Sequence, residues 1–278
     1  MKLGINGATM KPWPLEKQIA AASSAGFQGI ELWRDKVEQY LATHELAELA
    51  DLLASHQLEP TGLCFVYLGY GDGQQAERLR ALQEIVELAA DVGARGIAVC
   101  AARTLPEGTS KAELLRLAAA EAKLMAAIAV DKGVDLFLEP LGLHPAVPGP
   151  MEALEIIKGA DSPNIKLLFD VFHYYRSNVS LEEIAATPVE RLAAIHVNDA
   201  EDLPSEEQSD FKRLYPTLGV LPAAEMLRIP RNQGFDGYVT VEVFRPEYWE
   251  NDPDIALHSM QYLKALLAQV PWATGETE

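Results

Sequence analysis

Cysteine, basic charge and long apolar runs are all scarce in this sequence of 278 residues. The only two cysteines, Cys64 and Cys100, each lie in an apolar run, which predicts two buried, unreactive thiols. No stretch approaches the roughly 18 uncharged apolar residues of a membrane span, and the first residues lack the pattern of a secretory signal. These absences predict a soluble cytoplasmic protein with reduced thiols.

Basic residues are outnumbered, with 23 lysines and arginines against 41 aspartates and glutamates and a formal net charge of −18 at pH 7. Such a surface repels phosphate backbones and anionic lipid headgroups, so we expect neither nucleic acid nor a membrane as partner. The glycine-rich phosphate-binding motifs are also absent, since Asn6-Gly-Ala-Thr-Met10 follows the first apolar run. We therefore expect no nucleotide cofactor.

What the sequence does contain is an alternation of short apolar runs and helical windows. Nearly continuous apolar runs are typical of strands that are covered on both faces or closed into a barrel. The eight expected strands are 2–6, 29–33, 60–67, 96–101, 135–139, 165–170, 192–198 and 237–243. The helical windows are 14–24, 37–56, 74–92, 110–132, 151–160, 223–233 and 254–269.

This alternation predicts an α/β protein that forms a single (β/α)8 TIM barrel. The expected domain spans residues 1–278, with 273–278 as a frayed tail. The alternative is an open doubly wound sheet, but that fold normally binds a nucleotide at a glycine-rich first turn. Two capping boxes mark expected helix starts, one at Ser110 with Glu113 and one at Ser180 with Glu183.

The working residues of such a barrel lie at the C-terminal ends of its strands, because all the βα loops open on that face. Four successive strand ends each carry one potential metal ligand, namely Glu139, Asp170, His196 and Glu242. Each residue alone has an ordinary structural explanation, such as a helix cap, a turn or a hydrogen-bonded core histidine. Together, three carboxylates and one imidazole predict one divalent ion, Mn²⁺, Co²⁺ or Zn²⁺, since their charges would otherwise repel one another.

Other residues near strand ends are weaker candidates. His173, three residues after Asp170, is predicted to contact a substrate oxygen or to support a metal ligand. The remaining candidates for substrate contact are Arg213, Arg245, Trp33, Glu31 and His144, for which a surface ion pair or a place in the core is the alternative. Trp13, Tyr67 and Tyr70 also lie where they could wall the mouth of a site.

Several segments resemble a known family. Gly29-Ile-Glu-Leu-Trp33, Leu138-Glu-Pro-Leu141, Phe169-Asp-Val-Phe-His173, His196-Val-Asn-Asp199 and Val241-Glu-Val243 together resemble the xylose-isomerase-like TIM-barrel superfamily of sugar isomerases and epimerases. Within it, residues 196–204 and 241–249 are similar to the inosose (2-keto-myo-inositol) isomerases of inositol catabolism. The resemblance implies that the four strand-end residues hold the metal. It also implies that Glu139 and Glu242 are the acid/base pair, and that His173 and Arg213 contact the substrate.

The implied activity is a metal-dependent isomerisation of a small sugar or polyol ketone, with an inosose as the first candidate substrate. The implied mechanism is proton transfer between carbon and carboxylate through a metal-stabilised enediolate. The same ligands would serve a ketose 3-epimerase, a hydroxypyruvate isomerase-like enzyme or an inosose dehydratase, so the ligand set does not choose among them. A multinuclear abasic-site endonuclease is disfavoured by the charge of −18 and by only six histidines. A non-catalytic binding barrel and a homo-oligomer are left open.

Overall fold

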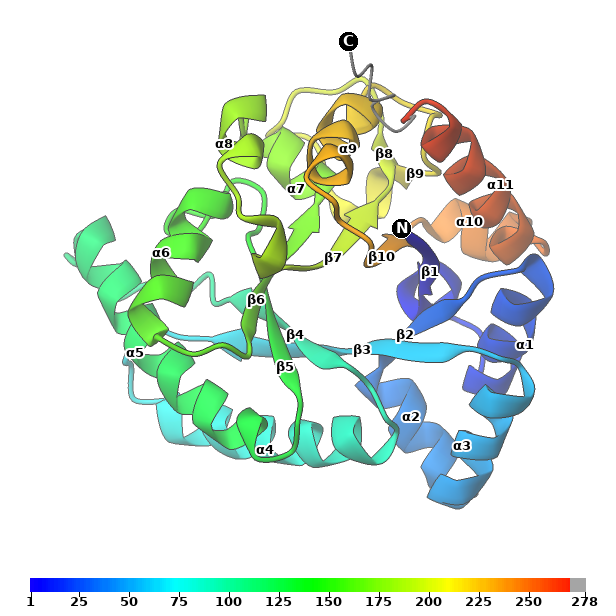
Figure 1. Cartoon of the computed structure of the whole chain (residues 1–278), viewed down its shortest axis with the longest axis horizontal. Helices are drawn as coiled ribbons and strands as arrows, with labels where there is room; N and C mark the ends of the chain where they lie inside the picture. Colours follow the sequence, from blue (N-terminus) through cyan, green and yellow to red (C-terminus); the bar gives the residue numbers. More distant parts are fainter. Residues whose placement is uncertain (271–278) are drawn as a thin grey trace, which may run out of the picture.

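The chain forms a closed barrel of eight parallel strands with helices outside it (Figure 1). Residues 1–270 of a computed structural model are described here. Around the barrel the strand order is β1-β10-β7-β6-β5-β4-β3-β2, so the last strand of the chain closes the ring onto the first. The strands are β1 (Lys2–Asn6), β2 (Gly29–Trp33), β3 (Glu59–Leu68), β4 (Gly96–Ala101), β5 (Asp135–Glu139), β6 (Ile165–Asp170), β7 (Leu192–Val197) and β10 (Tyr238–Val241). The predicted TIM barrel is confirmed.

Helices follow the strands and cover the outside of the barrel (Figure 1). They are α1 (Leu15–Ala25), α2 (Arg34–Leu41), α3 (Leu46–Ser55), α4 (Gln75–Asp91), α5 (Lys111–Val130), α6 (Pro150–Ala160), α7 (Val171–Arg176), α8 (Leu181–Ala185), α9 (Ala223–Asn232), α10 (Pro246–Asn251) and α11 (Ile255–Ala268), with short 3-10 turns η1 (Gly7–Met10), η2 (Val189–Arg191) and η3 (Asp210–Lys212). None of the helices within residues 1–270 combines the length and the apolar character that crossing a bilayer requires.

The predicted helix caps are only partly as expected. Ser180 and Glu183 form the complete capping box at the start of α8. Ser110 accepts a hydrogen bond from the backbone of Glu113, but the Glu113 carboxylate bonds to Arg116 instead of returning to the cap. The box predicted at the start of α5 is therefore half formed.

Two other predictions needed correction. The window 37–56, predicted as one helix, is divided into α2 and α3, because Glu45 starts a new helix with a capping box of its own. A small antiparallel pair, β8 (Asp199–Ala200) with β9 (Arg213–Leu214), was not predicted from the sequence. The predicted frayed tail at 273–278 lies outside the described residues.

A small apolar layer lies inside the barrel. We call it the interior layer, and its members come from β3 to β7: Cys64, Ala98, Phe137, Leu168 and Ala194. Gly96 makes room for it, because a Cβ at that position would lie 2.5 Å from the Phe137 ring. The much larger apolar core lies between the strands and the helices. Both cysteines are free and buried, as predicted.

Candidate metal centre

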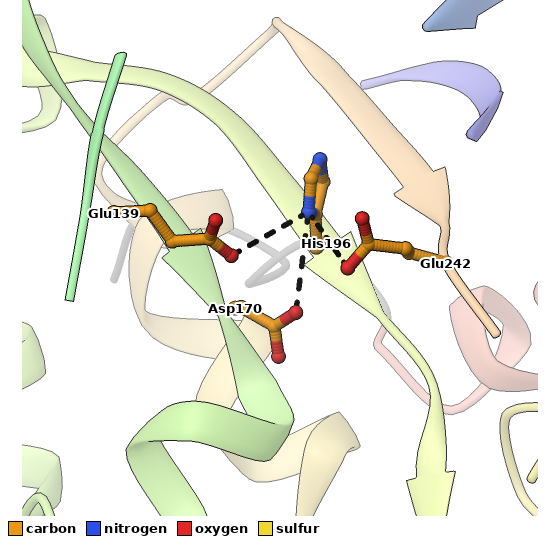
Figure 2. A group of neighbouring side chains, drawn as sticks. All are labelled: Glu139, Asp170, His196 and Glu242. Carbon is orange, nitrogen blue, oxygen red and sulfur yellow. Dashed lines mark ion pairs between the residues drawn. The ribbon is translucent and has the colours of Figure 1, made fainter. Parts of the chain in front are cut away.

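Four polar side chains meet at the carboxyl ends of β5, β6, β7 and β10 (Figure 2). Each offers one ligand atom, and these four atoms lie within 4.8 Å of one another. We call this group the cluster, and it consists of Glu139, Asp170, His196 and Glu242. The structure thus brings together the four residues that the sequence singled out as ligands.

Strand geometry explains why these side chains face inward. Side chains two residues apart on a strand point to the same face. Phe137, Leu168 and Ala194 belong to the interior layer, and the side chain two residues further along each strand is a member of the cluster. The cluster therefore lies directly above an apolar layer, toward the face where the βα loops open.

His196 is oriented so that one ring nitrogen faces the carboxylates. Its Nε2 lies 2.7 Å from Glu31 Oε2, and its Nδ1 has no hydrogen-bond partner although it is buried. This Nδ1 lies 3.4 Å from Glu242 Oε2 and 3.8 Å from Glu139 Oε1 (Figure 2). Because Glu31 engages Nε2, the other nitrogen is the one available to a ligand at the centre of the cluster.

The electrostatics of the cluster favour a cation. Burial, and then the charge of Glu242, raise the pKa of Glu139 well above its ordinary value. Burial alone would lower the pKa of His196, but the charges of Glu31 and Glu242 outweigh it and hold that pKa well above the usual range. Burial opposes ionisation of Asp170, yet the charge of Arg213 lowers its pKa to about 2. The cluster thus favours protons or a cation among its three carboxylates.

The donor set fits a divalent ion. Three carboxylates and one imidazole suit borderline ions such as Zn²⁺, Co²⁺ and Mn²⁺ better than calcium, which prefers oxygen alone. Glu139 Oε1 and His196 Nδ1 are both buried without a hydrogen-bond partner and 3.8 Å apart. An ion between such atoms would satisfy both of them.

Arg213 lies inside this group. It is 1% exposed, and its Nη1 donates hydrogen bonds to Asp170 Oδ2 at 2.9 Å and to Glu242 Oε2 at 2.6 Å. Its Nη2 donates to Asp210 Oδ1 at 2.7 Å. β9 positions this arginine, so the short pair of strands that the sequence did not predict carries a permanent positive charge into the cluster.

Asn6 is a functional candidate that the sequence reasoning missed. Its amide nitrogen donates hydrogen bonds to Glu31 Oε2 at 2.8 Å and Glu242 Oε1 at 3.0 Å. Its amide oxygen accepts from the indole of Trp33 at 2.7 Å and from the backbone of Ala8 at 2.8 Å. The signal was available, because Asn6 is the only strongly polar side chain in the first predicted strand after Lys2.

A cavity of about 240 Å³ opens above the cluster, and we call it the cluster cavity. One side is aromatic, with Trp33 meeting both Phe65 and Phe244 edge to face and Phe65 meeting Tyr67 in the same way. The charged lining residues are Arg103, Glu139, His173, His196, Asp210, Arg213 and Glu242. An aromatic wall facing charged and hydrogen-bonding groups suits a ligand with both C–H and hydroxyl surfaces.

The other predicted contact residues separate into two groups. His173 lines the cluster cavity, with Nε2 3.8 Å from Glu139 Oε1 and 3.3 Å from Arg213 Nη2, and Trp33 also lines it. Arg245 pairs with Glu201 at 2.8 Å and does not line the cavity.

His144 and Glu31 do not line the cluster cavity either. The His144 side chain instead contacts backbone groups, and its Nδ1 accepts hydrogen bonds from the amides of Ala146 and Val147. Glu31 instead contacts Nε2 of His196, whereas the three carboxylates of the cluster face Nδ1. Among the aromatic candidates for the mouth, Tyr67 lines the cavity, whereas Trp13 and Tyr70 do not.

The fold and the cluster define a TIM barrel with a candidate metal centre at the carboxyl ends of its strands. The chain belongs to the xylose isomerase-like TIM barrel family, whose model matches residues 19–266. The inosose isomerase of Bacillus velezensis is 27% identical over 256 residues, which cover 90% of this chain and 91% of that protein. The 3-dehydro-D-guloside 4-epimerase of Escherichia coli is 23% identical, over 87% of this chain and 92% of that protein.

A solved structure is similar over almost the whole chain. The crystal structure of the IolI protein with a binding zinc atom has a TM-score of 0.87 and 25% identity, and the match covers 97% of this chain and 98% of that one. The family resemblance inferred from the sequence motifs is thereby confirmed.

Proposed function

We propose that this protein is a divalent-metal-dependent isomerase of a sugar or polyol ketone, with an inosose as the first substrate to test. Its similarity to enzymes named isomerase and epimerase supports the reaction class. The observation that carries the proposal is the convergence of four ligand atoms within 4.8 Å, directly beneath a cavity of about 240 Å³.

Glu139, Asp170, His196 and Glu242 would hold the ion, and the zinc named for the IolI structure supports this part of the proposal. When bound, a divalent ion supplies Lewis acidity toward the substrate carbonyl, which makes the neighbouring C–H more acidic.

Two carboxylates of the chain are placed to move the proton. Glu139 and Glu242 come from opposite sides of the cluster (Figure 2). The Glu242 oxygens accept from Asn6 and Arg213, whereas Glu139 Oε1 has no hydrogen-bond partner. Glu139 is therefore the freer group and would take a proton from one carbon as Glu242 gives a proton of its own to the other, after which a proton passes from Glu139 to Glu242 to reset the pair.

The surroundings protect this transfer. His173 lines the cluster cavity beside Glu139, where it would contact the substrate, and its Nε2 accepts a hydrogen bond from Arg213 Nη2. The aromatic side of the cavity packs against the C–H face of a ring, and the interior layer closes the barrel beneath the cluster. Proton exchange with bulk water is thus limited to the open face.

The test is exchange of ring protons for deuterium. Protein stripped of metal by a chelator is given 2-keto-myo-inositol in D₂O, followed by Mn²⁺, Co²⁺ or Zn²⁺, and ring-proton signals are recorded by NMR. We expect exchange only with an added ion, and none in Glu139→Gln. Arg116→Gln, on the exposed surface of α5, is the matched control and should exchange normally. Absence of exchange with the keto-inositol and with every ketose tried, under all three ions, would sink the proposal.

Epimerisation is the second candidate, because the sequence is also similar to a 4-epimerase. The same carboxylates would then return the proton to the original carbon from the opposite face. Product analysis separates the outcomes, since a migrated ketone indicates isomerisation, an inverted centre epimerisation, and a dehydrated product an inosose dehydratase. Rapid turnover of hydroxypyruvate would instead indicate a hydroxypyruvate isomerase-like enzyme.

A further inference from the structure

A second and larger cavity adjoins the cluster cavity. It has a volume of about 580 Å³ and lies between the carboxyl ends of β3 and β4 and the start of α4, and we call it the side cavity. Tyr67, Arg103 and Leu141 line both cavities. The two cavities are therefore neighbours, and a substituent on a ring bound above the cluster would extend toward the side cavity.

Arg103 stands at this junction without an acidic partner. Its one hydrogen bond runs from Nη2 to the carbonyl oxygen of Gly142 at 3.4 Å, and it forms no ion pair with any of the residues 1–270. The other arginine of the side cavity, Arg78, is held by Asp72 and Glu121. Arg103 is exposed and lines both cavities, so its guanidinium is available to an anionic group of a ligand bound there.

Arg176 adds positive charge at the same edge. Its side chain packs against Gly142, since a Cβ at that glycine would lie 2.8 Å from Arg176 Cβ. It donates to the carbonyl oxygen of Ser205 at 3.2 Å and likewise has no ion pair within the described part of the chain. Burial lowers the pKa of Arg176, and the charges of Arg103 and Arg213 lower it further, whereas Asp210 raises it. Arg103 and Arg176 thus both contact Gly142.

The cluster itself is a poor place for an anionic substituent, because three carboxylates already converge there. Arg103 lines both the cluster cavity and the side cavity. It could therefore bind an anion while the substrate ring stays above the metal-ligand residues of the cluster. Tyr67, which is 50% exposed, offers an apolar surface for the carbon atoms in between.

Resting on the proposed function, we propose that the side cavity is a subsite for a substituent of the substrate, and that Arg103 binds its anionic group. A carboxylate and a phosphate monoester share the chemistry that a guanidinium recognises, two oxygens accepting parallel hydrogen bonds. The protein would then prefer ring or chain ketones that carry such a group over the neutral compounds.

Three ketoses that differ only at C6 provide the test, namely D-fructose, D-fructuronate and D-fructose 6-phosphate. Their dissociation constants are measured by calorimetry on the Mn²⁺-loaded full chain, with wild type, Arg103→Gln and the control Arg116→Gln. We expect at least one anionic ketose to bind about tenfold or more tightly than fructose, as a charged hydrogen bond implies. Arg103→Gln should remove that preference, weakening the anionic ketose at least about tenfold more than it weakens fructose. The carboxylate and phosphate arms identify which anion is preferred.

Equal affinity for the three ketoses, binding of none of them, or an equal loss for fructose and the anions in Arg103→Gln would each overturn the subsite. Deuterium exchange on 2-keto-myo-inositol is run in parallel and separates this result from the fate of the proposed function. Exchange without an anion preference leaves the isomerase intact and removes the subsite. No exchange on any ketone removes the function on which the subsite rests.

Discussion

Glu31 and His196 are joined by a hydrogen bond of 2.7 Å that runs between β2 and β7 through the interior of the barrel. Both side chains are buried. The contact fixes the imidazole, with Nδ1 turned toward three carboxylates, so Glu31 acts on the candidate metal centre through His196.

Replacing Glu31 by glutamine should weaken metal binding. The amide can still contact Nε2, but it removes the negative charge that makes the imidazole a better donor. We expect the dissociation constant for Zn²⁺ or Mn²⁺ to rise about 10- to 100-fold. Competition with a chromogenic chelator measures it. The control is Glu59→Gln, which changes a carboxylate that pairs with Arg95 near the start of β3. Equal metal affinities in wild type and Glu31→Gln would show that Glu31 does not support His196 as a ligand.

Asn6→Ala should lower the rate more than substrate binding. It removes the donors to Glu31 and Glu242 and the acceptor of the Trp33 indole, so Glu242 loses one of its two side-chain restraints. We expect kcat to fall at least tenfold with a smaller change in KM, and the free energy of unfolding to fall by about 1–3 kcal/mol. Asn251→Ala, at an exposed site on α10, is the matched control. An unchanged kcat would contradict a positioning role for Asn6.

Chelation should destabilise the protein as well as inactivate it. Without an ion, the crowded carboxylates depend on Arg213 and on protons for neutralisation. A ligand present at 100 times its dissociation constant stabilises the folded state by about 2.7 kcal/mol. Calorimetric scans with chelator and with added Zn²⁺ or Mn²⁺ should therefore show a higher Tm with metal, and a smaller gain in Glu139→Gln. Identical melting curves would argue against a folded-state ion site.

Glu121 on α5 offers a test of stability away from the cluster. It is fully buried and accepts hydrogen bonds from Arg78 at 2.6 Å and from the Gly69 amide at 3.0 Å. Glu121→Ala leaves Arg78 with only Asp72 and leaves the Gly69 amide without its acceptor, and we expect the free energy of unfolding to fall by about 3 kcal/mol in urea titrations. Glu113→Gln, which breaks an exposed pair on the same helix, should leave the midpoint unchanged. Equal midpoints for both variants would show that the buried pair contributes nothing.

The sequence was sufficient for the barrel and for the four residues of the cluster, because both follow from local regularities. Apolar runs mark the strands, and a polar residue at a strand's carboxyl end in this fold must face the loops or the interior. The position of Arg213 inside the cluster could not be predicted, because β9 is only two residues long and such a short strand has no periodic pattern in the sequence. His144 looked like a site residue only because it follows β5, and the backbone contacts that occupy its ring leave no mark in the sequence.

The interior layer closes the barrel on the side away from the βα loops. Phe137 and its four neighbours lie beneath the cluster, so substrate and product would enter and leave the cluster cavity on the side of the βα loops. A product that stays bound near Arg103 and Tyr67, which line the cavity, would delay the next turnover. Substitutions near Arg103 and Tyr67 should therefore change the turnover rate without altering any ligand of the cluster.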